Sequence, residues 1–460
     1  MLVSCDSACD FEQEFEEHEL TEGVFSIRPS TARKILELDT LGSFDFFTLI
    51  VTLDSLDTKS IAAFHEALSV NDMSALRPIF PLIHHEYRHF IDSTSTLWGA
   101  NHLNLMNEAY LSSPEMGAAE TEYWKAKVFD NHISSIRYPK EYITLEKNVE
   151  PTRPWSSEIA YGLGYSTIGP SYECYCLYSH FFNRTGELLV KAPLTAVSVL
   201  EASAMCMEIN MHVDMIGNMD EDDKFVEQHL YSQFATDEIH RPELIEYYLC
   251  QLTLIRFINC DNGFKVFRMC EYVCRLTLNI PKSIANKWAS LDTLNKILDV
   301  AADDPLLRIV KGELKRCNVS FVFYLLCCAL RDTTIHNLSD MDKSMSTALN
   351  RLETTLEEVQ TDSKKAALEL FEELDKSDIA SIRTIADAGK FNMLKIPLTS
   401  DTPDMLELKL PPVYLGDWEK IVVFGAPMNT LQTIDIDVVY EELFAGEQWV
   451  RKFYGSMVLL

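Results

Sequence analysis

The central helix of this chain is predicted from residues 79–94, which read IFPLIHHEYRHFIDST. Apolar side chains recur there at helical spacing. Pro81 in this stretch and Pro78 just before it lie near the start, where a helix tolerates proline best. We therefore predict one helix over residues 75–97. His85 and His89 are four residues apart, so this helix places their imidazoles on one face, one turn apart.

Glu86 directly follows the first of these histidines. Two imidazole nitrogens can each lie about 2.0–2.1 Å from one zinc ion. Zinc lowers the pKa of a bound water to about 7 and polarises a carbonyl group. Glu86 is positioned beside such an ion, where its carboxylate can accept the proton of that water. The pattern therefore predicts Zn²⁺ as cofactor, His85 and His89 as ligands, and Glu86 as general base.

A hydrolytic zinc site needs a third protein ligand, and a second strong helix, predicted over residues 192–215, contains the candidates. Glu201 is favoured because the small residues that follow it let this helix approach the motif helix closely. Glu208 is the first alternative. His212 and Asp214 remain further alternatives for the same role.

Asp92 continues the face of the two histidines but is not expected to bind the same ion. Seven residues on a helix span about 10.5 Å along its axis, so His85 and Asp92 cannot reach one ion. Two interpretations of Asp92 stay open. It either accepts the second ring N–H of His89 or is a solvated surface carboxylate.

These two segments resemble the gluzincin branch of the zinc metallopeptidases. The residues His85-Glu86-x-x-His89 are followed downstream by a helical Glu-x-x-Ala that starts at Glu201. The resemblance implies that the two histidines and Glu201 bind zinc and that Glu86 is the base. It covers two short segments only. It also departs from the family at Met205, where many gluzincins carry aspartate.

The resemblance further implies a small sheet before the motif helix, with an edge strand that aligns the substrate. Strand-like segments at 24–27, 34–38 and 44–52 are expected to form it. The predicted fold is α+β and predominantly α-helical. It places a small N-terminal β-sheet next to a zincin-like helical core, with a large helical accessory region.

Four regions are predicted along the chain. They are an acidic tail at 1–22, a catalytic core at 23–220, a helical accessory region at 221–390 and a mixed α/β region at 391–460. Within the core, Asp57 is expected to cap the N-terminus of a helix.

Metallopeptidases usually add a side chain that stabilises the tetrahedral oxyanion. Tyr161, Tyr165 and His212 are the candidates for this role. Both tyrosines lie in the glycine-rich segment 161–169, which is interpreted as a flexible loop beside the substrate.

The composition limits the partners. The chain has 460 residues and a net charge of −30, which disfavours binding to nucleic acid and to anionic membranes. No run of about 18 apolar residues appears, so no membrane span is expected. The twelve cysteines include no CxxC pair and lie mostly in apolar segments. They are interpreted as free thiols, which predicts a cytoplasmic protein.

The predicted function is zinc-dependent hydrolysis of peptide bonds in a protein or peptide substrate, with a regulatory protein partner engaging the helical region. The alternative is a catalytically inactive helical interaction protein with a pseudo-peptidase core. The two hypotheses differ in whether the site binds metal, and in whether Glu86→Gln abolishes cleavage.

Overall fold

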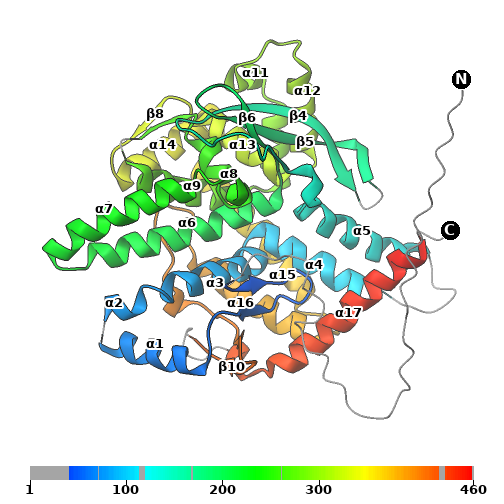
Figure 1. Ribbon diagram of the computed structural model, residues 1–460. Coiled ribbons are helices and arrows are strands. Elements are labelled where there is room, and N and C mark those ends of the chain that lie inside the picture. The colour runs from blue at the N-terminus through cyan, green and yellow to red at the C-terminus, as the bar shows by residue number, and fades with distance from the viewer. Residues whose placement is uncertain are drawn as a thin grey trace, which may run out of the picture. The chain divides into compact units, whose positions relative to one another are not determined.

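Short apolar strands form a small sheet that contacts the motif helix (Figure 1). The structure is a computed structural model that describes residues 41–70, 72–112, 120–166, 169–260, 262–423 and 430–457. The first sheet has the order β1 (Ser43–Phe44), β2 (Val51–Leu53), β9 (Val413–Leu415) and β10 (Lys420–Ile421). β2 and β9 are parallel, and the other pairs are antiparallel.

The strand predicted over 44–52 is wrong in its middle, where the chain makes a turn. The Asp45 carboxylate accepts hydrogen bonds from the Phe47 N–H and the Thr48 hydroxyl, both at 3.0 Å. Leu49 then has a left-handed φ of 57°. A side chain that bonds its own backbone competes with a strand ladder, and the alternation of residues does not reveal this. The predicted tail and first strands, residues 1–22, 24–27 and 34–38, lie outside the described residues.

The next elements are α1 (Thr58–Val70), α2 (Met73–Leu76), α3 (Phe80–Thr94) and α4 (Leu97–Tyr110). The cap of α1 is confirmed, because the Ser60 N–H donates to Asp57 Oδ1 at 2.8 Å. The single helix predicted over 75–97 is divided into α2 and α3. Pro78 lies between them and has no N–H to donate, whereas Pro81 lies in the first turn of α3.

A second sheet is antiparallel and has the order β3 (Thr144–Leu145), β6 (Leu188–Leu194), β5 (Gly169–Phe182) and β4 (Ser156–Ser166). The loop expected over 161–169 is wrong, because its described residues belong to β4 and β5. The Tyr178 ring lies over Gly162, where a Cβ would be 2.9 Å from a ring carbon. Glycine here allows close cross-strand packing rather than a loop.

Before this sheet lie α5 (Glu120–Ile136) and η2 (Lys140–Tyr142), and after it comes α6 (Ala196–Gly217). The predicted start of this helix at 192 is too early. Pro193 lies in β6, where it pairs with Tyr178 of β5. Thr195 begins the helix with a capping box that Ser198 completes. Helix α6 packs against α3, α8 and α9.

The accessory region is helical, as expected. It contains α7 (Glu221–Glu238), η3 (Pro242–Leu244), α8 (Ile245–Leu254), α9 (Gly263–Thr277), α10 (Lys282–Ala289), α11 (Leu294–Leu298), α12 (Pro305–Lys315), α13 (Val319–Ala329), α14 (Leu338–Arg351), α15 (Leu356–Leu374) and α16 (Ala380–Lys395). Strands β7 (Ile258–Cys260) and β8 (Thr333–Ile335) pair in parallel between them. The chain then passes through η4 (Met405–Glu407) and η5 (Thr430–Thr433) to α17 (Ile436–Met457).

Two hydrophobic cores lie within the compact unit 41–460. One contains the buried face of α3 together with α4, α16 and α17. The other contains the second sheet, most of α6, and helices α8 to α14. The contact between α3 and α6 therefore joins the two cores (Figure 1). The predicted boundaries at 220 and 390 stay predictions.

The predominantly helical α+β class is confirmed. Among the described residues, no helix has both the length and the apolar character that crossing a bilayer requires.

Candidate metal centre

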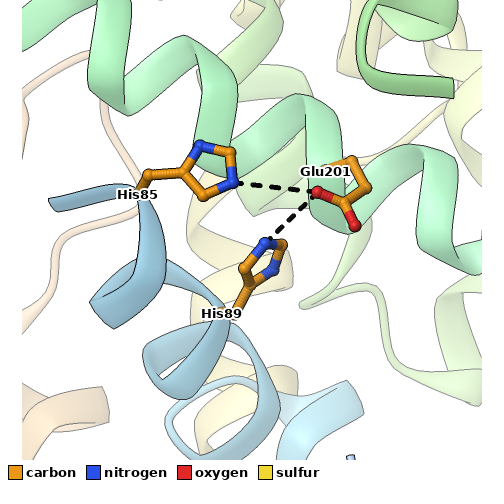
Figure 2. Close-up of side chains that lie close together, drawn as sticks. All are labelled: His85, His89 and Glu201. Carbon is orange, nitrogen blue, oxygen red and sulfur yellow. Dashed lines mark ion pairs between the residues drawn. The ribbon is translucent and has the colours of Figure 1, made fainter. Parts of the chain in front are cut away.

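Helices α3 and α6 bring His85, His89 and Glu201 together (Figure 2). Glu201 Oε2 lies 3.8 Å from His85 Nε2 and 3.3 Å from His89 Nε2. One ligand atom from each residue lies within 4.8 Å of the other two, and all three residues are buried. Within the described chain, this is the group of histidine, cysteine and acidic side chains arranged to hold a metal ion.

The spacing of these atoms suits a small tetrahedral ion. Two ligand atoms that each lie about 2.0–2.1 Å from one ion are about 3.3 Å apart at the tetrahedral angle. The distances from Glu201 Oε2 to the two Nε2 atoms, 3.3 and 3.8 Å, are close to that value. Nitrogen and carboxylate donors in this ratio suit zinc and other borderline divalent ions. The geometry itself does not select the metal.

Glu208, the alternative third ligand, contacts the opposite side of the His85 ring. Its Oε2 lies 2.9 Å from His85 Nδ1. A carboxylate there orients the ring and leaves Nε2 directed at Glu201. Burial lowers the pKa of His85, but the Glu208 hydrogen bond and the surrounding carboxylates outweigh it and raise this pKa to about 9. The site thus favours a positive charge, which either a proton on His85 or a bound cation can supply.

Glu86 is only 5% exposed, and its Oε2 has no hydrogen-bond partner among the described residues. Burial raises the pKa of Glu86 to about 7, against the opposing effect of His85 and His89. A carboxyl with this pKa can both accept and return a proton near neutral pH. The backbone at Gly42 closes over it, since a Cβ there would be 2.8 Å from Glu86 Oε1.

Arg137, Glu246 and Tyr247 are neighbours of the site that sequence reasoning missed. Arg137 Nη2 donates to Glu201 Oε1 at 2.8 Å, and its Nε lies 3.4 Å from Glu246 Oε1. Burial raises the pKa of Glu201, but His89, Arg137 and His85 lower it to about 2. The charge of Glu201, followed by burial, raises the pKa of Tyr247. No motif links these residues to the helices that carry the ligands.

The remaining candidates for the third ligand are engaged elsewhere. His212 Nε2 accepts from Arg77 Nε at 2.9 Å, and its ring stacks on Tyr231 with centroids 3.9 Å apart. Burial and the charge of Arg77 lower the pKa of His212 to about 4. Asp214 pairs with Arg268. The structure therefore does not bring His212 or Asp214 to the group.

Both interpretations of Asp92 are wrong. Its carboxylate is fully buried, and Oδ1 lies 3.0 Å from Arg88 Nε. Its charge is therefore neutralised by Arg88 rather than by solvent. His89 Nδ1 has no hydrogen-bond partner in the part of the chain that the structure describes, so Asp92 does not bond it. Arg88 lies four residues before Asp92, one helical turn away, and this spacing was the signal in the sequence for the ion pair.

Tyr161 and Tyr165 lie on β4. The Tyr161 side chain is exposed, and the Tyr165 ring packs against Tyr138 and Tyr142, with centroids 5.8 and 5.4 Å apart. No described hydrogen bond joins either tyrosine to the histidines or to Glu201. Their role at the oxyanion stays a prediction, as does that of His212, and Tyr247 becomes a fourth candidate for it.

Because comparisons with known proteins found no match, the assignment of a function rests on this geometry. No protein-family model, no curated protein and no solved structure matches the chain.

Proposed function

We propose that this chain is a zinc-dependent hydrolase of peptide bonds, acting on a protein or peptide substrate in the cytoplasm. The observation that carries the proposal is the convergence of His85 Nε2 and His89 Nε2 on one oxygen of Glu201. The described cysteines are free thiols, which supports a reducing compartment.

Zinc bound by these three residues would polarise the substrate carbonyl and acidify a water molecule. Side chains of the protein would supply the proton transfer and would position the ligands. Glu86 follows His85 on the same helix, and its buried Oε2 has no hydrogen-bond partner among the described residues, so it would take the proton from the water and return it to the leaving amine. Glu208 holds the ring of His85, and Arg137 holds Glu201.

Strand β1 supports a peptide as the substrate class. Among the strands that the structure describes, it is an edge strand of the first sheet, and Gly42 immediately before it lies against Glu86. An extended peptide can align along such an edge through main-chain hydrogen bonds. Alignment there would bring its carbonyl groups close to the proposed base.

The experiment has two parts. Metal content is measured by mass spectrometry in wild type and His89→Ala, with about one zinc per chain expected in the first and a loss in the second. Cleavage of a fluorogenic peptide library is then measured for Glu86→Gln and for Glu66→Gln, an exposed control on α1. We expect Glu86→Gln to retain zinc and to lose cleavage by a factor of about 10²–10⁴. Metal-free wild-type protein, or undiminished cleavage by Glu86→Gln, would contradict the proposal.

One observation favours the alternative, an inactive interaction protein. The histidines, Glu86 and Glu201 are each at most 7% exposed. Two residues that contact this group are more accessible, Arg137 and Glu208, whose side chains are 40% and 34% exposed. Stoichiometric zinc with no cleavage of any library peptide would favour this alternative.

A further inference from the structure

Arg137 occupies a position between the candidate metal group and the accessory helices. It directly follows α5 and precedes η2. Its guanidinium contacts Glu201 of α6 through Nη2 and Glu246 of α8 through Nε. One cation at the end of α5 thus connects two further helices, α6 and α8, that come from different parts of the chain.

Arg137 contacts only one of the two carboxylate oxygens of Glu201. Oε1 accepts the hydrogen bond from Arg137 at 2.8 Å, while Oε2 faces both histidines. The planar guanidinium directs separate nitrogens to the two carboxylates, Nη2 to Glu201 and Nε to Glu246, whereas a lysine ammonium is a single point charge. Arg137 therefore presents a single oxygen of Glu201 to the ion and prevents rotation of the carboxylate.

Glu246 in turn restrains Arg137. Its Oε1 lies 3.4 Å from Arg137 Nε, and its side chain is 27% exposed. Glu246 lies in the first turn of α8, a helix that belongs to the second hydrophobic core. A movement of α8 would therefore be transmitted to Glu201 through two ionic contacts.

We propose that Arg137 is the positioning residue of the metal site and that the Glu246–Arg137–Glu201 chain lets helix α8 set the affinity of the site for its ion. This inference rests on the proposed metal site, but not on the reaction. The accessory region then regulates the site through ion binding.

The test measures Zn²⁺ affinity by competition with a chromophoric chelator. Arg137→Met is compared with Arg153→Met, a matched control whose arginine also has a 40% exposed side chain and also pairs with a carboxylate, that of Asp237 at 2.7 Å. We expect Arg137→Met to weaken zinc binding by about 10–100-fold. Glu246→Gln should weaken it less, Arg137→Lys should recover part of the loss, and Arg153→Met should leave it unchanged.

The absorption spectrum of the Co²⁺-substituted protein gives a readout that a general loss of stability would not change. Arg137→Met should alter the ligand-field bands, because Glu201 can then bind through both oxygens. Zinc affinity and a Co²⁺ spectrum that both match Arg153→Met would overturn the proposal. If Arg137→Met does not fold, Arg137→Lys and Glu246→Gln decide, and wild-type affinity in both would overturn it. A wild type that binds zinc without hydrolysing peptides would refute the reaction and leave this inference standing.

Discussion

Helix α3 carries two buried polar faces that are stabilised in different ways. On one face, Arg88 lies 3.0 Å from Asp92 and 3.5 Å from Glu271, and Arg275 donates to Glu271 at 2.6 Å. Two cations therefore meet two carboxylates, all of them almost fully buried. This face is electrically balanced by side chains of the protein itself.

The other face of α3 is not balanced in this way. It carries His85, Glu86 and His89, and it meets the carboxylates of Glu201 and Glu208. Glu86 Oε2 and His89 Nδ1 lack hydrogen-bond partners among the residues described, as do Asp92 Oδ2 and Arg275 Nε on the balanced face, so the two faces differ in their charges rather than in unpartnered atoms. Buried charges are costly unless they are paired or bind a metal. The comparison teaches that the second face sets three carboxylates, those of Glu86, Glu201 and Glu208, against one arginine, Arg137. It is therefore short of positive charge, which is the condition for a cation site.

The largest expected effect concerns the balanced face. Arg88→Met should lower the free energy of unfolding by roughly 3–5 kcal/mol, because Asp92 stays buried without its cation. Urea denaturation measures it. Arg331→Met, which breaks the exposed pair with Asp299, should cost less than about 1 kcal/mol. Equal losses in the two variants would show that the buried pair is not a balanced unit.

The next effect concerns the cation site. Zinc at about 100 times its Kd should raise the free energy of unfolding of wild type by about 2.7 kcal/mol. His89→Ala should lose this gain, whereas Arg88→Met should keep it, because its face does not contact the ion. Denaturation with and without added zinc measures both. An equal gain in wild type and His89→Ala would remove the distinction between the two faces.

A buried histidine that needs no cation sharpens the comparison. His102 Nδ1 lies 3.0 Å from His132 Nε2, and its Nε2 lies 2.9 Å from the Phe46 carbonyl oxygen. Burial lowers the pKa of His102 to about 4, so below about 6.5 the unfolded state binds more protons than the folded state. Stability therefore falls as the pH drops from 6.5 towards 4.

Between pH 7 and pH 5, protonation of His102 in the unfolded state should lower the free energy of unfolding by about 2 kcal/mol. The loss should be smaller in His102→Gln, whose amide can still donate to the Phe46 carbonyl. Urea denaturation at the two pH values measures the difference, and His229→Gln, an exposed change on α7, is the control. The same pH dependence in all three proteins would rule out His102 as its source.

The smallest effect concerns the space beside Glu86. Gly42→Ala would place a Cβ 2.8 Å from Glu86 Oε1 and 2.9 Å from the Thr52 carbonyl oxygen, so the carboxylate must move. We expect kcat to fall about tenfold, equivalent to about 1.4 kcal/mol, with zinc content unchanged. The control is Gly312→Ala, where a Cβ would meet no atom within 4 Å. Unchanged turnover in Gly42→Ala would mean that Glu86 is not held from this side.

Local patterns were enough to predict the fold class and the grouping of the candidate ligands. Helical spacing placed His85 and His89 on one face, and the small residues after Glu201 indicated that α6 could approach α3. The Asp57 cap was found in the same way. These predictions succeed because each depends on residues within a few positions of one another.

Contacts between distant segments could not be predicted. Arg137 lies 64 positions before Glu201, and nothing near it in the chain indicates that partner. Gly162 of β4 was misread because its fit depends on Tyr178 in the neighbouring strand. Glu201 and Glu208 share one face of α6, and only the position of α6 along α3 decides that one faces Nε2 of His85 and the other Nδ1.

The first sheet has a consequence for the order in which the protein is made. β2 pairs in parallel with β9, Thr58 bonds with Asp417 at a separation of 359 positions, and the Tyr87 hydroxyl of the motif helix donates to the Pro411 carbonyl, 324 positions later. At about 5–20 residues per second, a ribosome needs roughly 16–65 s to cover that last interval. During synthesis the motif helix is therefore made well before the sheet beside it can be completed. A chain that terminates before β9 carries every proposed ligand but cannot close the sheet beside them, so the proposed hydrolase would be assembled only after β9 has been made.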